Sequence, residues 1–275
     1  MGEVREVVLS KRLKCLADMV TPGNGVADVG CDHGFLSVYL VQKGISQKVL
    51  AMDVRMGPLS RAGEHIAAYE LGDYIETRLS DGLSAYHEGE AQTLVCAGMG
   101  GRLMKRILSA YENKTRSFQE LILQPQSELY EFRLFLRENG YEILQENILC
   151  EEGKYYFMMK VSCGHQPSTE DKTGGLTNSV CEQTQRLYDR YGEKLLLAKH
   201  PVLKEYLLER QQVVRQIEEG LVQQDKERAR ERLSQVREEL LEISQALEII
   251  KKEGQVNVYD NDKRRAEAIS TGNYL

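Results

Sequence analysis

The stretch DVGCDHGFL, residues 28–36, joins a short apolar run to a longer one. The run before it has the length of a buried strand, and the run after it has the length of a helix. A strand that ends in a glycine-rich turn before a helix is typical of nucleotide-binding α/β folds. This turn departs from the usual pattern, because Asp32 stands where a phosphate-binding turn has glycine.

The composition fits one full apolar core and a smaller second part. The chain has 275 residues, 41% of them hydrophobic, and a formal net charge of −6. Such an acidic chain would have to meet a nucleic acid through a local basic patch. The N-terminus lacks the apolar core of a signal peptide, and no apolar run nears the roughly 18 residues of a membrane span. Six cysteines without a C-x-x-C pair favour reduced thiols over a metal site. We therefore expect a cytoplasmic protein with neither a membrane segment nor a bound metal.

Five short apolar runs predict parallel strands. They are VADVG (26–30), KVLAMD (48–53), YIETRLS (74–80), TLVCAG (93–98) and ELILQP (120–125). Amphipathic stretches of helical length, such as 56–71 and 101–112, separate them, and residues 8–20 predict a further amphipathic helix. The alternation predicts an α/β fold whose parallel sheet is covered on both faces. Residues 141–161 instead predict an antiparallel hairpin at the sheet edge, because two β-prone runs flank EEGK.

The composition changes after residue 163 and predicts a second, helical part. Residues 164–177 are polar and rich in turn formers, which is typical of a linker. Apolar residues then fall at 3-and-4 spacing in two runs, separated by the charged stretch 223–230. We expect an α/β domain over 1–163, a linker over 164–177, a coiled-coil hairpin over 178–253 and a polar tail over 254–275. The first helical segment should break near Pro201.

The turn after the first strand favours a ligand with a positive charge. Ligands bind an α/β sheet beyond the carboxyl ends of its strands, where the strand order switches. Asp32 would repel a pyrophosphate there, and Phe35 stands where a dinucleotide fingerprint needs a small residue. S-adenosylmethionine carries an ammonium, a sulfonium and no phosphate. The pattern D-x-G-x-D-x-G therefore predicts a methyltransferase rather than a dehydrogenase, with Asp28, Gly30, Asp32 and His33 at the cofactor.

Three later strand ends complete the expected cofactor site. Asp53 ends the second run, where it either accepts from both ribose hydroxyls or caps the following helix. Asp81 and Gly82 follow the third run, where they either meet the cofactor's adenine or merely make a turn. Ala97 and Gly98 end the fourth run, where glycine either lets the backbone approach a ligand or serves a tight turn.

These motifs occur in an order that resembles one known family. VADVGCDHGFL (26–36), AMDVRMGPL (51–59), RLSDGL (78–83), VCAGMGGRLM (95–104) and LILQPQ (121–126) together resemble the bacterial tRNA adenine-22 N1-methyltransferases, the TrmK family. The similarity continues through LRENGYEILQENI (136–148) and EEGKYYFMMKV (151–161) to the helical hairpin. Ser37 and Gln126 depart from the family pattern, which usually has proline and asparagine there. Loop geometry near the substrate can therefore differ.

The resemblance implies a class I (Rossmann-like) methyltransferase domain followed by a coiled-coil domain. It implies methyl transfer from S-adenosylmethionine to N1 of an adenine at position 22, in the D-arm region of tRNA. A methyltransferase acting on a small molecule or a protein is the alternative, and a non-catalytic docking protein is a second. A monomer is favoured.

Adenine N1 carries a free lone pair, so the expected transfer needs no base. The product is cationic, and a carboxylate that accepts from the exocyclic amine would offset the developing charge. Asp32 should lie beside the methyl-bearing end of the cofactor, so we predict that it is catalytic. Alternatively, Asp32 binds the cofactor's ammonium or caps the helix near Phe35. His33 either contacts the cofactor or an RNA phosphate, or plays a structural role.

RNA contacts are expected around the glycine run and the first helix. N1 lies on the Watson–Crick edge, so the target adenine must be unpaired or flipped out. Cations near the cavity could contact phosphates, although such charges are often only a solvated helix face. The candidates for substrate binding are Lys11, Arg12, Lys14, Met99, Gly100, Gly101, Arg102 and Lys105.

Overall fold

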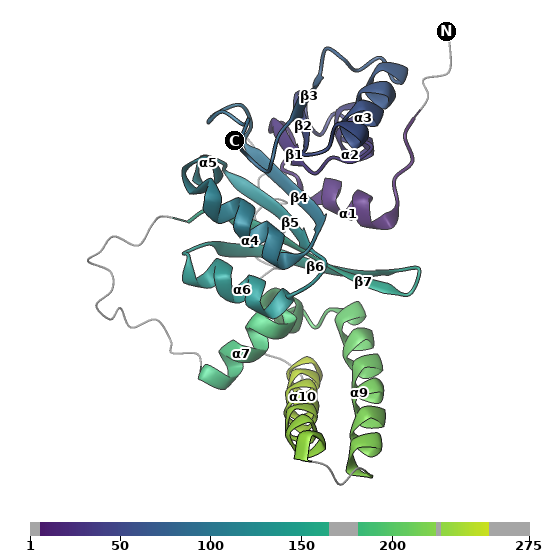
Figure 1. The fold of residues 1–275 in the computed structure, drawn as a ribbon, viewed down its shortest axis with the longest axis vertical. Coiled ribbons are helices and arrows are strands. Elements are labelled where there is room, and N and C mark those ends of the chain that lie inside the picture. The colour runs from purple at the N-terminus through teal and green to yellow at the C-terminus, as the bar shows by residue number, and fades with distance from the viewer. Residues whose placement is uncertain (1–5, 165–180, 224–226, 253–275) are drawn as a thin grey trace, which may run out of the picture.

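A seven-stranded mixed sheet forms the body of the molecule (Figure 1). The computed structural model describes residues 6–164, 181–223 and 227–252. The strand order is β3-β2-β1-β4-β5-β7-β6. The first five strands along the chain pair in parallel, and the last two pair antiparallel. The strands are β1 (Val26–Val29), β2 (Val49–Asp53), β3 (Ile75–Leu79), β4 (Thr93–Met99), β5 (Glu120–Pro125), β6 (Glu142–Glu151) and β7 (Lys154–Ser162).

The prediction of a parallel sheet with an antiparallel hairpin at its edge is confirmed. Every residue of β1, β2 and β5 is buried, which explains why these strands read as continuous apolar runs. The hairpin returns toward the sheet, so that β7 pairs with β5 and β6 forms the outer edge.

The helices before β4 cover one face of the sheet. They are α1 (Lys11–Met19), α2 (Phe35–Gln42) and α3 (Met56–Ala68). Leu16, Leu40 and Ile66 pack in one core with alternate strand residues such as Val49. The first helix is shorter than the predicted 8–20, because the Ser10 hydroxyl accepts from the Leu13 N–H and so caps it.

The helices after β4 cover the opposite face. They are α4 (Gly101–Ala110), α5 (Glu112–Arg116) and α6 (Leu129–Glu138). Met104 and Phe132 pack there with the other set of strand residues, such as Leu50. The strand order reverses between β1 and β4, since the chain runs to β2 and β3 on one side and to β5 on the other. A ligand crevice is therefore expected at the carboxyl ends of β1 and β4.

Four helices follow the sheet in the described residues from 181 onward: α7 (Glu182–Tyr191), α8 (Glu193–Leu197), α9 (Pro201–Val222) and α10 (Glu227–Lys251). Helices α9 and α10 form a hairpin that buries Val214 and Ile243. The predicted break near Pro201 is present, because α9 begins at that residue. The charged stretch predicted to separate the two helical runs, 223–230, is longer than the break in the structure, because α10 already begins at Glu227. The charged residues of this stretch are good helix formers.

The predicted linker lies outside the described residues after Gly164, and the predicted tail lies outside them entirely. None of the helices in the described ranges combines the length and apolar character that a membrane crossing requires.

The helical part rests on the β6–β7 hairpin. Ile148 and Phe157 from that hairpin share an apolar core with Leu195 and Leu203. A buried ion pair lies at the same junction, with Arg133 Nε donating to Glu146 Oε1 over 2.8 Å. Glu146 Oε2 also accepts from the Lys194 backbone N–H. This pair therefore ties α6 and β6 to the helices that follow.

Replacing Arg133 with methionine should destabilise the protein strongly. The Arg133 and Glu146 side chains are 2% and 1% exposed, so the change leaves a buried carboxylate without its cation. Breaking such a pair costs about 3–5 kcal/mol. The free energy of unfolding in urea measures this cost. Lys14→Met is the control, because Lys14 pairs with Asp18 on the exposed face of α1 and such pairs contribute about 0–1 kcal/mol. An equal decrease in the free energy of unfolding in the two variants would show that the buried pair does not stabilise the junction.

Candidate functional site

A cavity of about 690 Å³ lies at the carboxyl ends of β1, β2 and β4. This is the crevice that the strand order predicts. The structure brings all the predicted cofactor-binding residues together in its lining: Asp28, Gly30, Asp32, His33, Asp53, Asp81, Gly82, Ala97 and Gly98. Their order along the chain gave no distance between them, so their convergence is a finding of the structure.

The β1–α2 turn needs glycine at two positions. Gly30 has a φ of 79°, and a Cβ there would collide with the Met99 methyl group. Gly34 has a φ of 71°, and its Cβ would lie 3.1 Å from the Cβ of Ala62. These close contacts set the turn between β4 on one side and α3 on the other.

Asp32 occupies a left-handed backbone conformation, with a φ of 51°. Glycine adopts this conformation without strain, whereas a side chain makes it less favourable, although aspartate tolerates it better than most. The carboxylate is 63% exposed, and its Oδ1 lies 3.7 Å from His33 Nε2. The turn thus holds an exposed carboxylate at the lining of the cavity.

Two carboxylates are buried at adjoining strand ends. The Ser37 hydroxyl donates to Asp28 Oδ2 over 2.7 Å, and both groups are buried. Burial raises the pKa of Asp28 to about 6, the Ser37 hydrogen bond partly offsets this, and the charge of Asp53 adds to it. No cation pairs with Asp28 among the described residues. The site therefore favours a ligand that brings a positive charge to this carboxylate.

Asp53 stabilises the turn between β2 and α3. Its Oδ1 accepts from the Arg55 backbone N–H over 2.9 Å, while the exposed Arg55 guanidinium lies 3.8 Å away. The alternative of an N-cap is wrong, because the N-cap of α3 is Arg55 and it has no side-chain cap bond. Asp53 is buried yet lines the cavity, so it can still accept from a ligand's hydroxyl groups.

Arg12 brings a cation into the cavity from α1. Its Nη1 donates to Gln124 Oε1 over 3.0 Å, and the Gly98 N–H donates to the same oxygen over 3.2 Å. Arg12 and the Gln126 amide both lie beside Gly98. The sequence does not single out Gln124, because its role depends on a partner that lies far from it along the chain.

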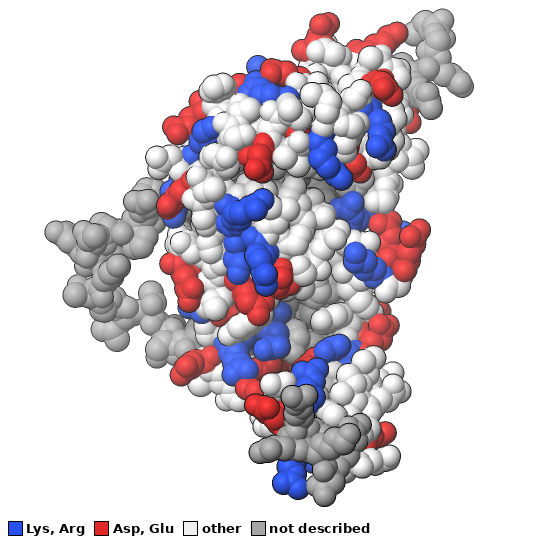
Figure 2. Space-filling view, in the orientation of Figure 1, with Lys and Arg blue, Asp and Glu red and all other residues white. Residues whose placement is uncertain are grey.

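A basic patch lies beside the cavity on α4. Figure 2 shows Lys and Arg side chains gathered over this helix, which carries Arg102, Lys105 and Arg106. Arg106 lines the cavity and has no ion-pair partner in the part of the chain that the structure describes. Arg102 is 88% exposed and lies 3.8 Å from Glu128. The patch is accessible to a large polyanion as well as to a small ligand.

The predicted substrate-binding residues divide into two groups. Arg12 and Met99 line the cavity, whereas the other six lie outside its lining: Lys11, Lys14, Gly100, Gly101, Arg102 and Lys105. A Cβ at Gly101 would lie 2.6 Å from the Ser127 carbonyl oxygen. That glycine therefore permits close packing of α4 on the loop before α6.

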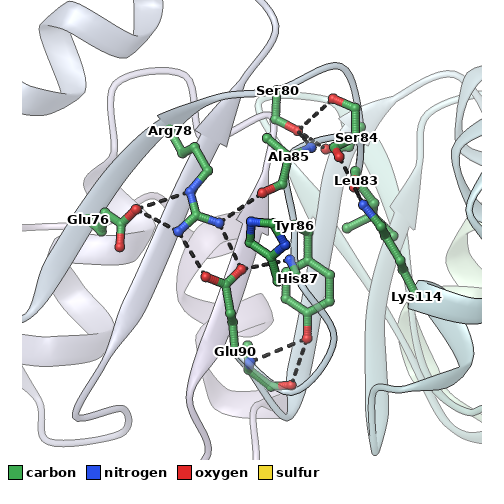
Figure 3. A network of polar contacts seen from close by, with 12 residues as sticks. Glu76, Arg78, Ser80, Leu83, Ser84, Ala85, Tyr86, His87, Glu90 and Lys114 are labelled. Atoms are coloured by element: carbon green, nitrogen blue, oxygen red, sulfur yellow. Dashed lines mark hydrogen bonds and ion pairs between the residues drawn. The ribbon is translucent and has the colours of Figure 1, made fainter.

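The loop that presents Asp81 is braced from β3 (Figure 3). Arg78 donates to both carboxylate oxygens of Glu90 over 2.7 and 2.9 Å, and to the Ala85 carbonyl over 2.9 Å. The guanidinium lowers the pKa of Glu90 to about 2. Lys114 Nζ donates to the carbonyl oxygens at 83 and 84 from the other side. These contacts fix the loop where it meets the cavity.

Within the described ranges, no group of three or more His, Cys, Asp and Glu side chains is arranged to hold a metal ion.

Ser37→Ala should make the affinity for S-adenosylmethionine more sensitive to acid. The Ser37 hydrogen bond lowers the pKa of Asp28, so its loss raises that pKa from about 6 and the carboxylate protonates at higher pH. A protonated Asp28 no longer attracts an ammonium. We therefore expect affinity to fall on acidification in both proteins, beginning at higher pH in the variant. Calorimetric titrations between roughly pH 5 and 8 measure this, because a carboxyl with a pKa of about 6 titrates within that range.

The matched control for Ser37 is Ser46→Ala. Ser46 is also buried, but its hydroxyl donates to carbonyls at the other end of the sheet. The ionisable groups of the cofactor titrate in the same way with this control, so their contribution to the pH profile is the same in all three proteins. Identical pH profiles for all three proteins would exclude Ser37 as a positioning residue.

Asp53→Ala should weaken binding of S-adenosylmethionine by about 10- to 100-fold. Hydrogen bonds to a charged group contribute about 1.5–3 kcal/mol, which corresponds to that range. Calorimetry on a variant with an unchanged melting temperature measures the effect. An unchanged affinity would remove Asp53 from the cofactor site.

Comparisons with known proteins agree with this site. A family model described as a methyltransferase domain matches residues 9–159. The tRNA (adenine(22)-N(1))-methyltransferase of Bacillus subtilis is 33% identical over 168 residues, which cover 61% of this chain and 71% of that protein.

Solved structures give the same result. The B. subtilis M1A22 tRNA methyltransferase TrmK is 29% identical with a TM-score of 0.72, and the match covers 88% of this chain and 99% of that one. A candidate tRNA (m1A22) methyltransferase from Streptococcus pneumoniae, solved with S-adenosyl-L-methionine, is 29% identical with a TM-score of 0.71, covering 87% of this chain and 100% of that one. The chain therefore belongs to the methyltransferase-domain family and, within it, to the TrmK family of bacterial tRNA (adenine-22-N1)-methyltransferases.

Proposed function

We propose that the protein transfers the methyl group of S-adenosylmethionine to N1 of adenine 22 in tRNA. One observation carries this proposal most directly. The cavity brings together a buried carboxylate that has no cation among the described residues, Asp28, and an exposed carboxylate in a left-handed turn, Asp32. The first suits a cationic cofactor, and the second suits a substrate on which positive charge develops. The B. subtilis relative is named as an enzyme that methylates N1 of adenine 22 in tRNA, a reaction that uses such a cofactor and such a substrate.

The residues present fit S-adenosylmethionine. A cavity of about 690 Å³ is within the range of sites for small molecules. Asp28 would receive the cofactor's ammonium, Asp53 the ribose hydroxyls and Asp81 the adenine amine. The cofactor supplies an electrophilic methyl group, which needs no further activation by a metal or a base. The protein therefore has to bind, orient and neutralise charge.

The transfer needs one bond to form and one to break. The lone pair of adenine N1 forms the bond to the methyl carbon, while the bond between that carbon and sulfur breaks and leaves its electrons on sulfur. Positive charge moves to the adenine ring and its exocyclic amine. Asp32 accepts from that amine and stabilises the charge as it develops. Arg12 and Gln126 lie beside Gly98, where they can orient the base.

The rest of the chain engages the tRNA body. The basic patch on α4 reaches the cavity through Arg106, and phosphates are its natural partners. The helical hairpin α9–α10 extends the molecule away from the sheet (Figure 1) and enlarges the surface that a tRNA can contact. We keep the predicted division into a methyltransferase domain, a linker, a helical domain and a tail as part of this proposal. A monomer acting in the cytoplasm also belongs to it.

Tritium transfer tests the substrate. Labelled S-adenosylmethionine is incubated with a tRNA transcript that carries adenine 22, and with a matched transcript that carries guanine there. We expect label only in the first transcript, and a rate that falls steeply with salt because phosphate contacts release counterions. Equal labelling of both transcripts would refute position 22. Label only in protein or small molecules would support the alternative substrate classes.

Asp32→Asn should lower turnover while leaving cofactor binding nearly intact. Asparagine tolerates a positive φ as well as aspartate does, so the turn is kept and only the charge is lost. Removing a group that acts mainly in the transition state lowers the rate constant by about 10²- to 10⁴-fold. Cofactor affinity should change by less than about tenfold, or 1.4 kcal/mol.

The outcome for Asp32→Asn separates two roles. Single-turnover rates at saturating tRNA and calorimetric affinities are measured on the same preparation. If saturating S-adenosylmethionine restores the rate, Asp32 binds the cofactor and is not catalytic.

A further inference from the structure

Three aromatic rings cluster where the β1–α2 turn meets α3. The rings of Phe35 and His65 have centroids 4.6 Å apart with an interplanar angle of 22°. His33 lies 5.9 Å from each of them, at 16° and 30°. His65 Nδ1 lies 2.9 Å from the His33 carbonyl oxygen, which holds the α3 ring against the turn. Phe35 is therefore stacked with both histidine rings, and the two histidine rings are tilted relative to each other.

This cluster extends outward from the rim of the cavity. His33 and Phe35 line the cavity beside Asp32, whereas His65 lies outside its lining. All three side chains are half-buried, so part of each ring stays accessible. The proposed cofactor contacts use Asp28 and Asp53 and do not need these rings. Phe35 and His65 have no partner assigned to them, and the prediction for His33 leaves both the cofactor and RNA open.

The chemistry of the cluster suits a nucleobase. Flat aromatic rings at the rim of a cavity offer a stacking surface, and every base has a π face that can use it. Arg61 is exposed one helical turn before His65 on α3 and has no ion-pair partner in the described part of the chain. A cation on the same helix face as one of the rings suits single-stranded nucleic acid, because a base and its phosphate bind together.

We propose that His33, Phe35 and His65 form a stacking platform for the RNA base adjacent to the target adenine. This inference rests on the proposed function. A flipped adenine leaves its neighbour without a stacking partner, which costs energy that the protein must offset. The platform replaces that lost stack while Asp32 meets the target base itself. It thereby contributes to RNA affinity and not to cofactor affinity.

Variants at His65 test the platform on the full chain. His65→Ala and His65→Gln both remove the ring, and the glutamine keeps a group able to reach the His33 carbonyl. His65→Phe keeps a ring and loses that contact. Stacking on one base contributes about tenfold or more in affinity. We therefore expect KM for tRNA to rise about tenfold in the first two variants and to change by less than threefold in the third. Turnover and the affinity for S-adenosylmethionine should stay within twofold.

Abasic RNA provides the matching change in the substrate. D-arm hairpins lacking the base immediately 5′ or immediately 3′ of the target adenine are compared with the complete hairpin. For the wild-type protein, one of the two abasic hairpins should raise KM about tenfold. With His65→Ala, the same abasic hairpin and the complete hairpin should have nearly equal KM values, because the protein and RNA changes remove one contact.

Several results would overturn the platform. One is a rise in KM from His65→Ala that adds to the rise from the abasic hairpin. Another is an unchanged KM of the wild-type protein for both abasic hairpins. A third is a rise in KM for tRNA in His65→Phe that matches the rise in His65→Ala. A parallel loss of cofactor affinity would assign the rings to the cofactor. The abasic arm uses wild-type protein and stays decisive even if a variant folds poorly. Failure of the proposed function is a separate result, since the wild-type protein would then leave the complete tRNA unmethylated.

Discussion

The burial of Asp28 at the end of β1, beside the buried Asp53 at the end of β2, is the constraint on which the rest of the site depends. A buried carboxylate is unfavourable unless hydrogen bonds or a cation offset its desolvation. Asp28 receives a hydrogen bond from Ser37, and the remaining compensation has to come from a ligand. The same burial therefore selects a cationic cofactor and rejects a phosphate.

The turn that follows β1 separates cofactor chemistry from substrate chemistry. Gly30 presses against Met99, and Gly34 packs on Ala62, so the residues between them project toward the cavity. Asp32 lies at the tip of this projection in a left-handed conformation. The position that a phosphate-binding turn would give to glycine thus carries a charged group. In our proposal, that group acts on the substrate base.

The sequence predicted the fold well because the signals involved are local. Continuous apolar runs mark strands that are buried on both faces, and strand ends identify Asp28 and Asp53 through the general geometry of parallel sheets. Contacts between distant residues could not be predicted in this way. Arg12 contacts Gln124, which lies 112 positions away along the chain. The sequence shows Ser37 only as a departure from a family pattern and does not predict its hydrogen bond to Asp28. The start of α10 differs from the prediction because a charged stretch suits an exposed helix as well as a break between helices.

Identification of the methylated nucleoside tests the central claim most directly. Transfer RNA is incubated with the protein and S-adenosylmethionine, digested to nucleosides and analysed by mass spectrometry against synthetic standards. A site that neutralises charge without a base should yield 1-methyladenosine, at no more than one per tRNA. Methylation at the exocyclic amine of adenine, or on a different nucleoside, would contradict the claim, because that chemistry needs another arrangement of groups around Asp32.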